Sequence, residues 1–296
     1  FNHEFYKRFR KAVKEANPNA IILAEHYGDP KPWLNGKEWD SVMNYDAFME
    51  PVTWFLTGMQ KHSDDFRGDM LGNSEAFFNT MTYAGNRFAN CSTLVAMNQL
   101  SNHDHSRFLT RTNGKVGRVN SLGSAAADEG VDKAVMRLAV MMQMTWMGAP
   151  TIYYGDEAGL TGFTDPDNRR TYPWGHEDNE LIGFHREMIR IHKKNPEIKK
   201  GSIKKLVSEP FLIAYGRFTQ TQCTIVVINR DVNERTTGVP VWEIAVPRGT
   251  EFTRVMLTER EGYTADRFPV EIEGGKMILK MPPVSGMVFE SKRSEE

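Results

Sequence analysis

Two acidic residues stand directly after apolar segments of this sequence. Glu25 follows the apolar residues 21–24, and Asp104 lies beside His103 at the polar end of the apolar segment 93–100. A carboxylate next to a buried strand is costly unless it has partners or a chemical task. In parallel α/β folds, active sites form at the carboxyl ends of the strands. We therefore interpret Glu25 and Asp104 as two parts of one catalytic site.

The elements that must position these residues alternate between helix and strand as far as about residue 195. Strands alternating with helices of ten to fifteen residues predict βαβ units and a parallel sheet. Four strands fit the second half of a (β/α)₈ TIM barrel better than a complete small sheet, because a whole barrel needs about 250 residues. The predicted strands are 20–26, 38–45, 93–100 and 150–155, and the predicted helices are 4–16, 50–59, one from 74, 132–147 and 181–193.

The pattern changes after residue 196. Short apolar segments follow one another with turn residues between them and no helical period, which is typical of an antiparallel β-sandwich. These segments are 211–215, 224–228, 252–256 and 277–281. We therefore predict two domains, with residues 1–197 as the C-terminal half of the barrel and residues 198–296 as the β-sandwich.

Composition excludes several classes of protein. The net charge of −1 gives no basic excess for nucleic acid, and the apolar stretch 138–147 is too short for a membrane span. Cys91 and Cys223 show no CxxC spacing, and the histidines show no i,i+4 spacing, so we expect no metal site. Few cysteines fit a reducing compartment but also many secreted bacterial enzymes. Localisation stays unknown, with the cytoplasm favoured over secretion.

The first residues predict an amphipathic helix that feeds a strand. A domain rarely opens in this way, and the sequence starts at Phe1 without Met. We therefore expect that an N-terminal part of the domain precedes this sequence. Half a barrel would leave open sheet edges, so we also expect low stability for this part alone.

Several motifs together resemble glycoside hydrolase family 13, the α-amylase family. The segment ending in Glu25 is similar to the family's fifth-strand motif, and Asn102-His103-Asp104 is similar to its seventh-strand motif. Residues 153–157 are similar to the family's eighth-strand motif, and residues 165–170 with 172–174 are similar to the loop after that strand. Residues 32–34 with 42–45 resemble the neopullulanase and cyclomaltodextrinase branch of the family.

The resemblance implies a role for each residue. Glu25 would be the general acid/base, since a glycosidic oxygen leaves well only when protonated, and partial burial of this Glu suits that role. Asp104 would stabilise the positive charge of the transition state. His103, Asp165 and Arg169 would bind sugar hydroxyls, and Trp33 and Tyr27 would stack on glucose rings.

Simpler structural roles compete with these assignments. Glu25 would then be an ion-paired residue at a strand end, and Asp165 and Arg169 would form a loop salt bridge. The Trp33 side chain would pack within its loop, and Asn44 and Tyr45 would pack at the top of the barrel. The methionines of 136–147 predict core packing rather than a cofactor site.

One catalytic group that the resemblance implies has no match in this sequence. The family's nucleophile is an Asp within a GxRxD pattern on the fourth strand, and no GxRxD occurs here. The family's structural calcium is bound mostly by segments that also have no match, so we expect no metal or other cofactor in this chain.

The function that fits best is the C-terminal portion of a retaining α-glucan hydrolase acting on starch-derived oligosaccharides, pullulan or cyclodextrins. We expect this chain alone to be inactive. A glucanotransferase, an α-glucosidase, or a non-catalytic amylase-like protein that binds sugar or accompanies a transporter remain alternatives. The expected partner is an α-glucan, with no nucleic acid and no membrane, and the full-length enzyme could form a homodimer.

Overall fold

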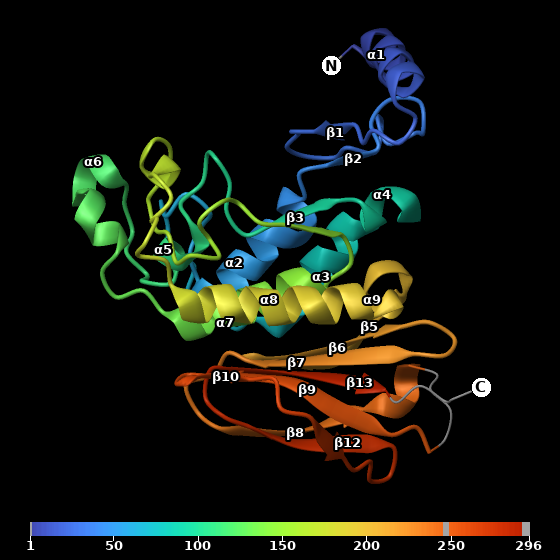
Figure 1. The fold of residues 1–296 in the computed structure, drawn as a ribbon, viewed down its shortest axis with the longest axis vertical. Coiled ribbons are helices and arrows are strands. Elements are labelled where there is room, and N and C mark those ends of the chain that lie inside the picture. Colours follow the sequence, from blue (N-terminus) through green and yellow to red (C-terminus); the bar gives the residue numbers. More distant parts are fainter. Residues whose placement is uncertain (1, 245–248, 292–296) are drawn as a thin grey trace.

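The computed structural model describes residues 2–244 and 249–291, and it arranges them in successive layers (Figure 1). Helix α1 and the first two strands lie at one end. Helices α2, α3, α7 and α8 lie in the middle, and antiparallel strands form the other end. Every helix in the described ranges is too short or too polar to cross a membrane.

Four short strands carry the α/β part, and all of their pairings are parallel. β1 (Leu23–Ala24) pairs with β2 (Ser41–Val42), and β3 (Met97–Gln99) pairs with β4 (Ala149–Thr151). A parallel bridge between Met43 and Met97 joins the two pairs. The four strands therefore run side by side in chain order, as the alternating pattern predicts, although each has only two or three residues.

The predicted burial of the first strand is wrong. Ile21 is 62% exposed and Leu23 is 39% exposed, while Ile22 between them is buried. Ile22 packs in a cluster with Trp39 and Val42, whereas no hydrophobic cluster of the described residues includes Ile21 or Leu23, so one face of β1 is uncovered. An apolar run predicts a strand but does not show whether both of its faces will be covered.

The predicted strand 93–100 begins too early. Residues up to Leu94 belong to the short helix α4 (Asn90–Leu94), and the Thr93 hydroxyl donates to the carbonyl of Ala89, one turn earlier. Short apolar runs do not distinguish helix from strand by period alone. The chain becomes extended only at Met97.

The longer helices confirm the predicted pattern. α1 (His3–Ala16) begins at Asn2, whose side chain accepts from the amide of Phe5. A π-helical turn, η1 (Tyr45–Met49), runs directly into α2 (Glu50–Thr57). The others are α3 (Ser74–Gly85), α7 (Lys133–Thr145) and α8 (Asn179–Lys194); short helices are α5 (Phe108–Arg111), α6 (Val119–Leu122), η2 (Ser124–Ala127), η3 (Asp167–Arg169), α9 (Pro196–Lys200) and η4 (Val241–Ile244).

Helix α7 is the centre of the main hydrophobic core. Asp132 caps it by accepting from the amides of Ala134 and Val135, and every residue from Ala134 to Thr145 is buried. Four of its methionines lie in the core, which confirms the packing role predicted for them. Thioethers fill irregular space well because their side chains are unbranched and flexible.

The C-terminal part is antiparallel, as predicted. Seven strands form one sheet, in the order β10-β9-β13-β7-β6-β5 with β11 beside β9, and β8 and β12 form a two-stranded second layer. The strands are β5 (Ser202–Glu209), β6 (Leu212–Phe218), β7 (Cys223–Asn229), β8 (Arg235–Pro240), β9 (Phe252–Glu259), β10 (Gly262–Thr264), β11 (Phe268–Val270), β12 (Lys276–Met281) and β13 (Ser285–Ser291).

Alternate residues of the large sheet enter two different cores. In β7, Val226 and Ile228 pack into the core that contains α7 and α8, whereas Ile225 and Val227 pack toward β8 and β12. This follows from the period of two along a strand. Because one core spans both parts of the chain, the domain division at residue 197 stays a prediction.

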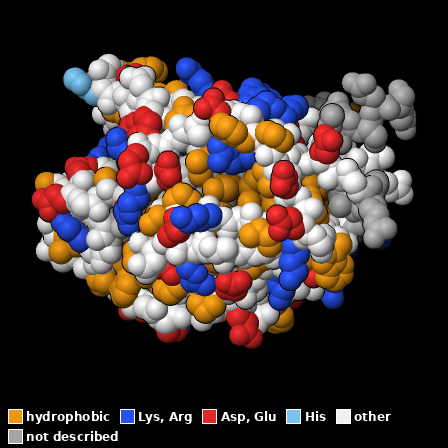
Figure 2. Space-filling model, turned by 90° about the horizontal axis from the view of Figure 1, so that it is seen from below, with side chains coloured by type: hydrophobic (Ala, Val, Ile, Leu, Met, Phe, Trp, Pro, Cys, Tyr) orange, Lys and Arg blue, Asp and Glu red, His pale blue; other side chains and the backbone are white. Residues whose placement is uncertain are grey.

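The surface on the side of β8 and β12 mixes side chains of every kind. Figure 2 shows basic and acidic side chains interspersed there among apolar ones. The exposed apolar residues include Trp242, at 64%, and Ile278, at 51%. The mixed charge on the described part of this face matches the balanced composition of the sequence.

Candidate active site

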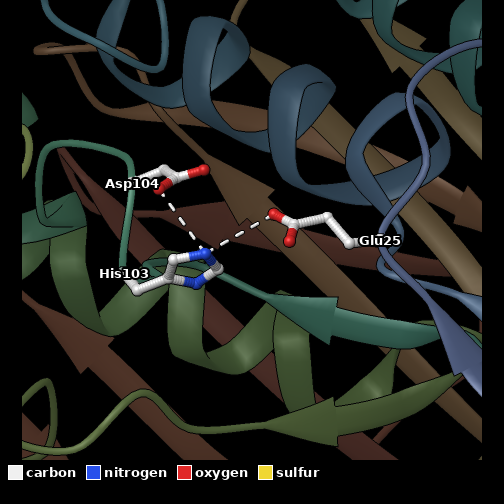
Figure 3. Close-up of side chains that lie close together, drawn as sticks. All are labelled: Glu25, His103 and Asp104. Atoms are coloured by element: carbon white, nitrogen blue, oxygen red, sulfur yellow. Dashed lines mark ion pairs between the residues drawn. The ribbon is translucent and has the colours of Figure 1, made fainter.

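Glu25, His103 and Asp104 lie together, as the sequence predicts. The Nε2 atom of His103 is 3.6 Å from Oε1 of Glu25 and 3.5 Å from Oδ1 of Asp104. Figure 3 shows both carboxylates turned toward one edge of the imidazole ring. Two carboxylates are therefore held near one imidazole nitrogen, although they are 79 positions apart in the sequence. Glu25, His103 and Asp104 together form the candidate catalytic cluster.

The two segments reach this point by different routes. Glu25 immediately follows β1, whereas His103 and Asp104 lie in a turn a few residues after β3. The side chain of Asn102 holds that turn, because its Oδ1 accepts from the amides of Asp104 and His105, both at 3.0 Å. Asparagine commonly stabilises turns in this way.

All three side chains are open to solvent. The exposed fractions are 42% for Glu25, 39% for His103 and 42% for Asp104. The partial burial expected for Glu25 is therefore smaller than the apolar segment before it suggests, because β1 itself is covered on one side only. A substrate can reach both carboxylates directly.

Tyr45 supports the site, in addition to the packing role expected for it. Its hydroxyl donates to Oε1 of Glu25 at 3.1 Å and accepts from Nδ2 of Asn102 at 3.1 Å. Its ring is stacked on Tyr27, with centroids 4.6 Å apart and an interplanar angle of 3°. Burial, then Tyr27 and Glu25, raise the pKa of Tyr45 well above the usual range, so the hydroxyl remains protonated and able to donate.

Tyr27 lies next to the catalytic cluster. One face of its ring is stacked on Tyr45, and its hydroxyl is 3.3 Å from Nε2 of His105. Nζ of Lys61 lies 4.8 Å from the ring centroid, within the range of a cation–π contact. The ring is 49% exposed, and its predicted stacking on a glucose ring stays a prediction.

His105 is a buried histidine that sequence reasoning did not assign to the site. Burial, the positive charge of Arg111 and the neighbouring His62 lower the pKa of His105 to about 2. Its ring is therefore neutral near pH 7. A neutral ring can share a proton with the Tyr27 hydroxyl, as the 3.3 Å contact indicates.

Asp165 and Arg169 also reach the site. Nε of Arg169 is 2.7 Å from Oδ1 of Asp165 and donates to the backbone carbonyl of His103 at 3.2 Å. The amide of Asp165 lies 3.4 Å from the carbonyl of Asp104. The loop salt bridge is thus present, and Arg169 also bonds it to the turn that carries His103 and Asp104. The predicted contact of these two residues with sugar stays a prediction.

Trp33 lies in a cluster of aromatic side chains. Its ring is stacked on Trp39 at 5.0 Å and on His3 at 5.3 Å, and His26 packs against it at 5.0 Å. These contacts agree with the packing role that was the alternative for this residue. Its predicted stacking on sugar stays a prediction.

A buried arginine connects the loop after β4 to the turn that carries His103 and Asp104. Arg107 donates to the carbonyl of Tyr154 at 2.8 Å, to Oδ1 of Asp156 at 3.0 Å and to the carbonyl of Asn168 at 2.9 Å. The side-chain amide of Asn168 in turn donates, through Nδ2, to the backbone carbonyl of Asn102 at 3.0 Å. This network accounts for the burial of Asp156, because its carboxylate is paired with the buried guanidinium of Arg107.

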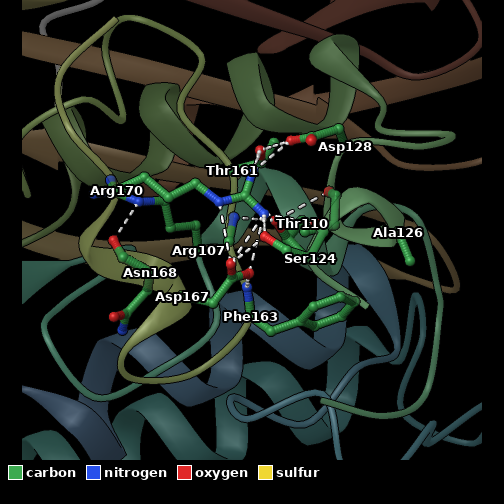
Figure 4. Close-up of polar contacts among 12 residues, drawn as sticks. Arg107, Thr110, Ser124, Ala126, Asp128, Thr161, Phe163, Asp167, Asn168 and Arg170 are labelled. Carbon is green, nitrogen blue, oxygen red and sulfur yellow. Dashed lines mark hydrogen bonds and ion pairs between the residues drawn. The ribbon is translucent and has the colours of Figure 1, made fainter. Parts of the chain in front are cut away.

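Arg170 connects further parts of the same loops (Figure 4). Its guanidinium donates to Asp128 at 2.8 Å, to Asp167 at 3.0 Å and to the carbonyl of Ser124 at 2.6 Å. These contacts hold the short helix η2 against the loop that carries Asp165 and Arg169. Because charged hydrogen bonds are the strong ones, this connection contributes rigidity near the site.

The donor atoms of Glu25, His103 and Asp104 all lie within 4.8 Å of one another, so among the described residues this group could hold a cation. Two carboxylate oxygens and one imidazole nitrogen would suit a borderline metal such as zinc. The same atoms are those that acid/base chemistry needs. The motifs around them favour acid/base chemistry.

Comparisons with known proteins give a consistent result. The protein-family model described as "Alpha amylase, catalytic domain" matches residues 1–210. A cyclomaltodextrinase of Thermoanaerobacter pseudethanolicus is 36% identical over 231 residues, which make up 77% of this chain and 35% of that protein. Neopullulanase 2 of Thermoactinomyces vulgaris is 31% identical over 292 residues, which make up 97% of this chain and 43% of that protein.

A solved structure gives the same result. A debranching enzyme from Nostoc punctiforme superposes with a TM-score of 0.75 at 26% identity, covering 96% of this chain and 54% of that one. The chain spans 35% to 43% of the length of the two curated relatives above. With its first 210 residues matched by the catalytic-domain model, the chain belongs to the alpha-amylase family, among relatives of the cyclomaltodextrinase and neopullulanase type.

Proposed function

We propose that this chain supplies the general acid/base, Glu25, and the transition-state-stabilising carboxylate, Asp104, of a retaining α-glucan hydrolase. The observation that carries the proposal is the position of His103, whose Nε2 lies 3.6 Å from one carboxylate and 3.5 Å from the other. With this arrangement, a sugar ring bound here would lie beside a proton donor and a fixed negative charge. Family membership supports hydrolysis of α-glucans as the chemistry.

The proposed division of labour follows from the contacts of each carboxylate. Glu25 would protonate the leaving glycosidic oxygen, and the Tyr45 hydroxyl would hold its carboxylate in place. Asp104, fixed by the Asn102 turn, would face the oxocarbenium-like ring as its positive charge develops. His103, Asp165 and Arg169 would bind ring hydroxyls, with Tyr27 and Trp33 as stacking surfaces.

The proposed substrates are α-glucans derived from starch. Relatives named cyclomaltodextrinase, neopullulanase and amylopullulanase support this class. We propose hydrolysis rather than transfer, because those names denote hydrolases. A glucanotransferase would use the same residues and would differ only in letting a sugar hydroxyl resolve the intermediate.

We further propose that the chain alone does not complete the reaction. A retaining mechanism needs a nucleophilic carboxylate about 5–5.5 Å from the acid. One carboxylate oxygen of Asp104 lies within 4.8 Å of one of Glu25, but the resemblance gives the nucleophilic role to the Asp of a GxRxD pattern, which the sequence does not contain. Under this proposal, water is not activated at the anomeric carbon by any residue of this chain.

External azide tests this division of roles directly. Azide replaces the nucleophile: its nitrogen forms a bond to the anomeric carbon of maltotetraose, the glycosidic C–O bond breaks, and the leaving maltose takes the proton of Glu25. We expect the purified chain to form maltosyl azide, detected by mass spectrometry, and to release no maltose without azide. Glu25→Gln should lower azide product at least ~100-fold, while Glu75→Gln, on the exposed surface of α3, should leave it unchanged.

The two parts of the proposal fail separately. Release of maltose without azide, abolished by Glu25→Gln, would show that the chain contains its own nucleophile. Labelling with a fluorinated α-glucosyl fluoride would then identify it, with Asp104 the first residue to inspect by peptide mapping. A folded chain that gives no product with or without azide would favour the non-catalytic, sugar-binding alternative.

A further inference from the structure

A cavity of about 490 Å³ lies outside the catalytic cluster, between α3, the segment before β3 and the start of β5. None of Glu25, His103 and Asp104 lines it. Its volume is within the range that small-molecule sites occupy, and such sites often form where two parts of a protein meet. Here the α/β part supplies most of the wall, and β5 of the antiparallel sheet supplies the rest.

The walls of this cavity combine aromatic surface with neutral hydrogen-bonding groups. Aromatic surface comes from Phe78, Phe88 and Trp146, and Met81 and Met147 add further apolar surface. The polar groups are three amides and three hydroxyls, contributed by Asn44, Asn86, Asn90, Thr82, Thr93 and Ser202. Among the residues that the structure describes, no carboxylate lines the cavity, and Lys205 is the single charged side chain in its wall.

One polar atom of the wall has an unmet hydrogen-bonding requirement. The side chain of Asn44 is 3% exposed, and its Nδ2 donates to Oδ1 of Asn98 at 2.7 Å. Its Oδ1 is buried and accepts no hydrogen bond from the described residues. An unsatisfied buried acceptor is unfavourable, and because this atom has almost no exposed surface, a donor reaches it only if the Asn44 side chain turns toward the cavity.

From these features we infer that the cavity is a second binding site, for a neutral hydroxyl-rich molecule of one or two hexose units. A sugar has an apolar face that packs on aromatic rings and hydroxyls that both donate and accept. The hydroxyls of the ligand would meet the amides and hydroxyls of the wall. The choice of an α-glucan end as the hexose ligand rests on the proposed function.

The site is separate from the catalytic cluster but close to it along the chain. Asn44 lines the cavity, and the next residue, Tyr45, donates its hydroxyl to Glu25. Asn44 also precedes the π-helical turn η1, a type of turn that often occurs at functional sites. A ligand that contacts Asn44 therefore lies one residue away from Tyr45, which positions the proposed acid/base, Glu25.

Gly85 allows the cavity to be filled without strain. It ends α3, has an ordinary helical φ, and lines the cavity; an added Cβ would meet no atom within 4 Å. Gly85→Phe should occupy the space that the ligand needs, whereas Gly85→Ala should leave it open. Thr82→Phe, at an exposed position on the same helix, is a second filling variant if the first folds poorly.

Maltose binding, measured by isothermal titration calorimetry in the Glu25→Gln chain, tests the inference. We expect saturable binding with a Kd of about 1 mM or tighter, retained in Gly85→Ala and in His103→Ala, and at least tenfold weaker in Gly85→Phe and Thr82→Phe. Equal affinity in the filled variants would overturn the inference. So would loss of all binding in His103→Ala, which would place maltose at the catalytic cluster, or the absence of saturable binding in every variant.

The outcome is independent of the azide reaction. Azide product without maltose binding at Gly85 would reject the second site and keep the proposed function. Maltose binding that Gly85→Phe removes, in a chain that forms no azide product, would keep the second site and reject the proposed function.

Discussion

The hydroxyl of Tyr45 donates to the carboxylate of Glu25 at 3.1 Å and accepts, at the same distance, from the amide of Asn102. One phenol therefore connects the segment that carries Glu25 with the turn that carries His103 and Asp104. Its raised pKa keeps it a donor at any working pH. The relative position of the two carboxylates depends on this residue as well as on their own strands.

Replacing Tyr45 by Phe tests that dependence. The ring remains and keeps its stacking on Tyr27, but the buried amide of Asn102 loses its acceptor and Glu25 loses its donor. We expect the free energy of unfolding to fall by about 1–3 kcal/mol. Urea denaturation followed by circular dichroism measures it.

Tyr27→Phe is the matched control for this variant. Tyr27 is 49% exposed and its hydroxyl makes a longer contact of 3.3 Å with His105, so we expect a smaller loss. Equal losses in the two variants would show that the Tyr45 hydroxyl has no special role.

The buried His105 should make the fold sensitive to acid. The pKa is 6.5 in the unfolded chain and about 2 in the folded one, so the unfolded state binds more protons between these values. Its stabilising contribution is complete above pH 6.5 and is lost as the pH falls toward 2, with a slope of up to about 1.4 kcal/mol per pH unit. We expect His105→Gln to reduce the difference in urea stability between pH 7.5 and pH 5.

His176→Gln is the control for the pH experiment, because His176 is exposed on the loop before α8. It should leave the pH dependence as it is in the unchanged chain. A His105→Gln chain with the same pH dependence as the unchanged chain would contradict the burial-based explanation.

The buried ion pair of Arg107 and Asp156 should matter far more than a surface pair. Their side chains are 0% and 5% exposed, and Asp156→Asn would leave the guanidinium buried without a counter-charge. We expect a loss of about 3–5 kcal/mol in the free energy of unfolding. Asp64→Asn breaks an exposed pair with Arg118 and should cost less than about 1 kcal/mol.

Arg170 is expected to order the loop that contains η2. Arg170→Met removes its contacts with Asp128, Asp167 and Ser124. Hydrogen exchange followed by mass spectrometry should then show faster exchange in residues 120–130, with α7 unchanged. Protection of residues 120–130 equal to that in the unchanged chain would mean that other contacts hold this loop.

Sequence motifs identified the residues that carry charge at the site. Glu25, His103 and Asp104 are chemically unusual at the ends of apolar segments, so their types and neighbours were informative, and the structure brings them together. Asp165 and Arg169 reach the same turn. The parallel and antiparallel parts of the fold were predicted for a similar reason, since the spacing of apolar residues differs between them.

The supporting residues could not be assigned to the site from the sequence. Tyr45 acts through a hydroxyl whose partners lie 20 and 57 positions away, and Arg107 reaches Asp156 across 49 positions. No local pattern records such long-range contacts. The exposure of Ile21 likewise depends on what covers β1, which is a property of tertiary packing.

The π-helical turn at Tyr45–Met49 determines where the side chain of Tyr45 points. A turn of this kind contains one more residue than an α-helical turn. Deleting one residue here would restore regular α-helical bonding into α2 and rotate position 45 by about 100° around the helix axis. The Tyr45 phenol would then no longer point at Glu25. The extra residue of this turn therefore sets the direction in which the Tyr45 side chain leaves the helix.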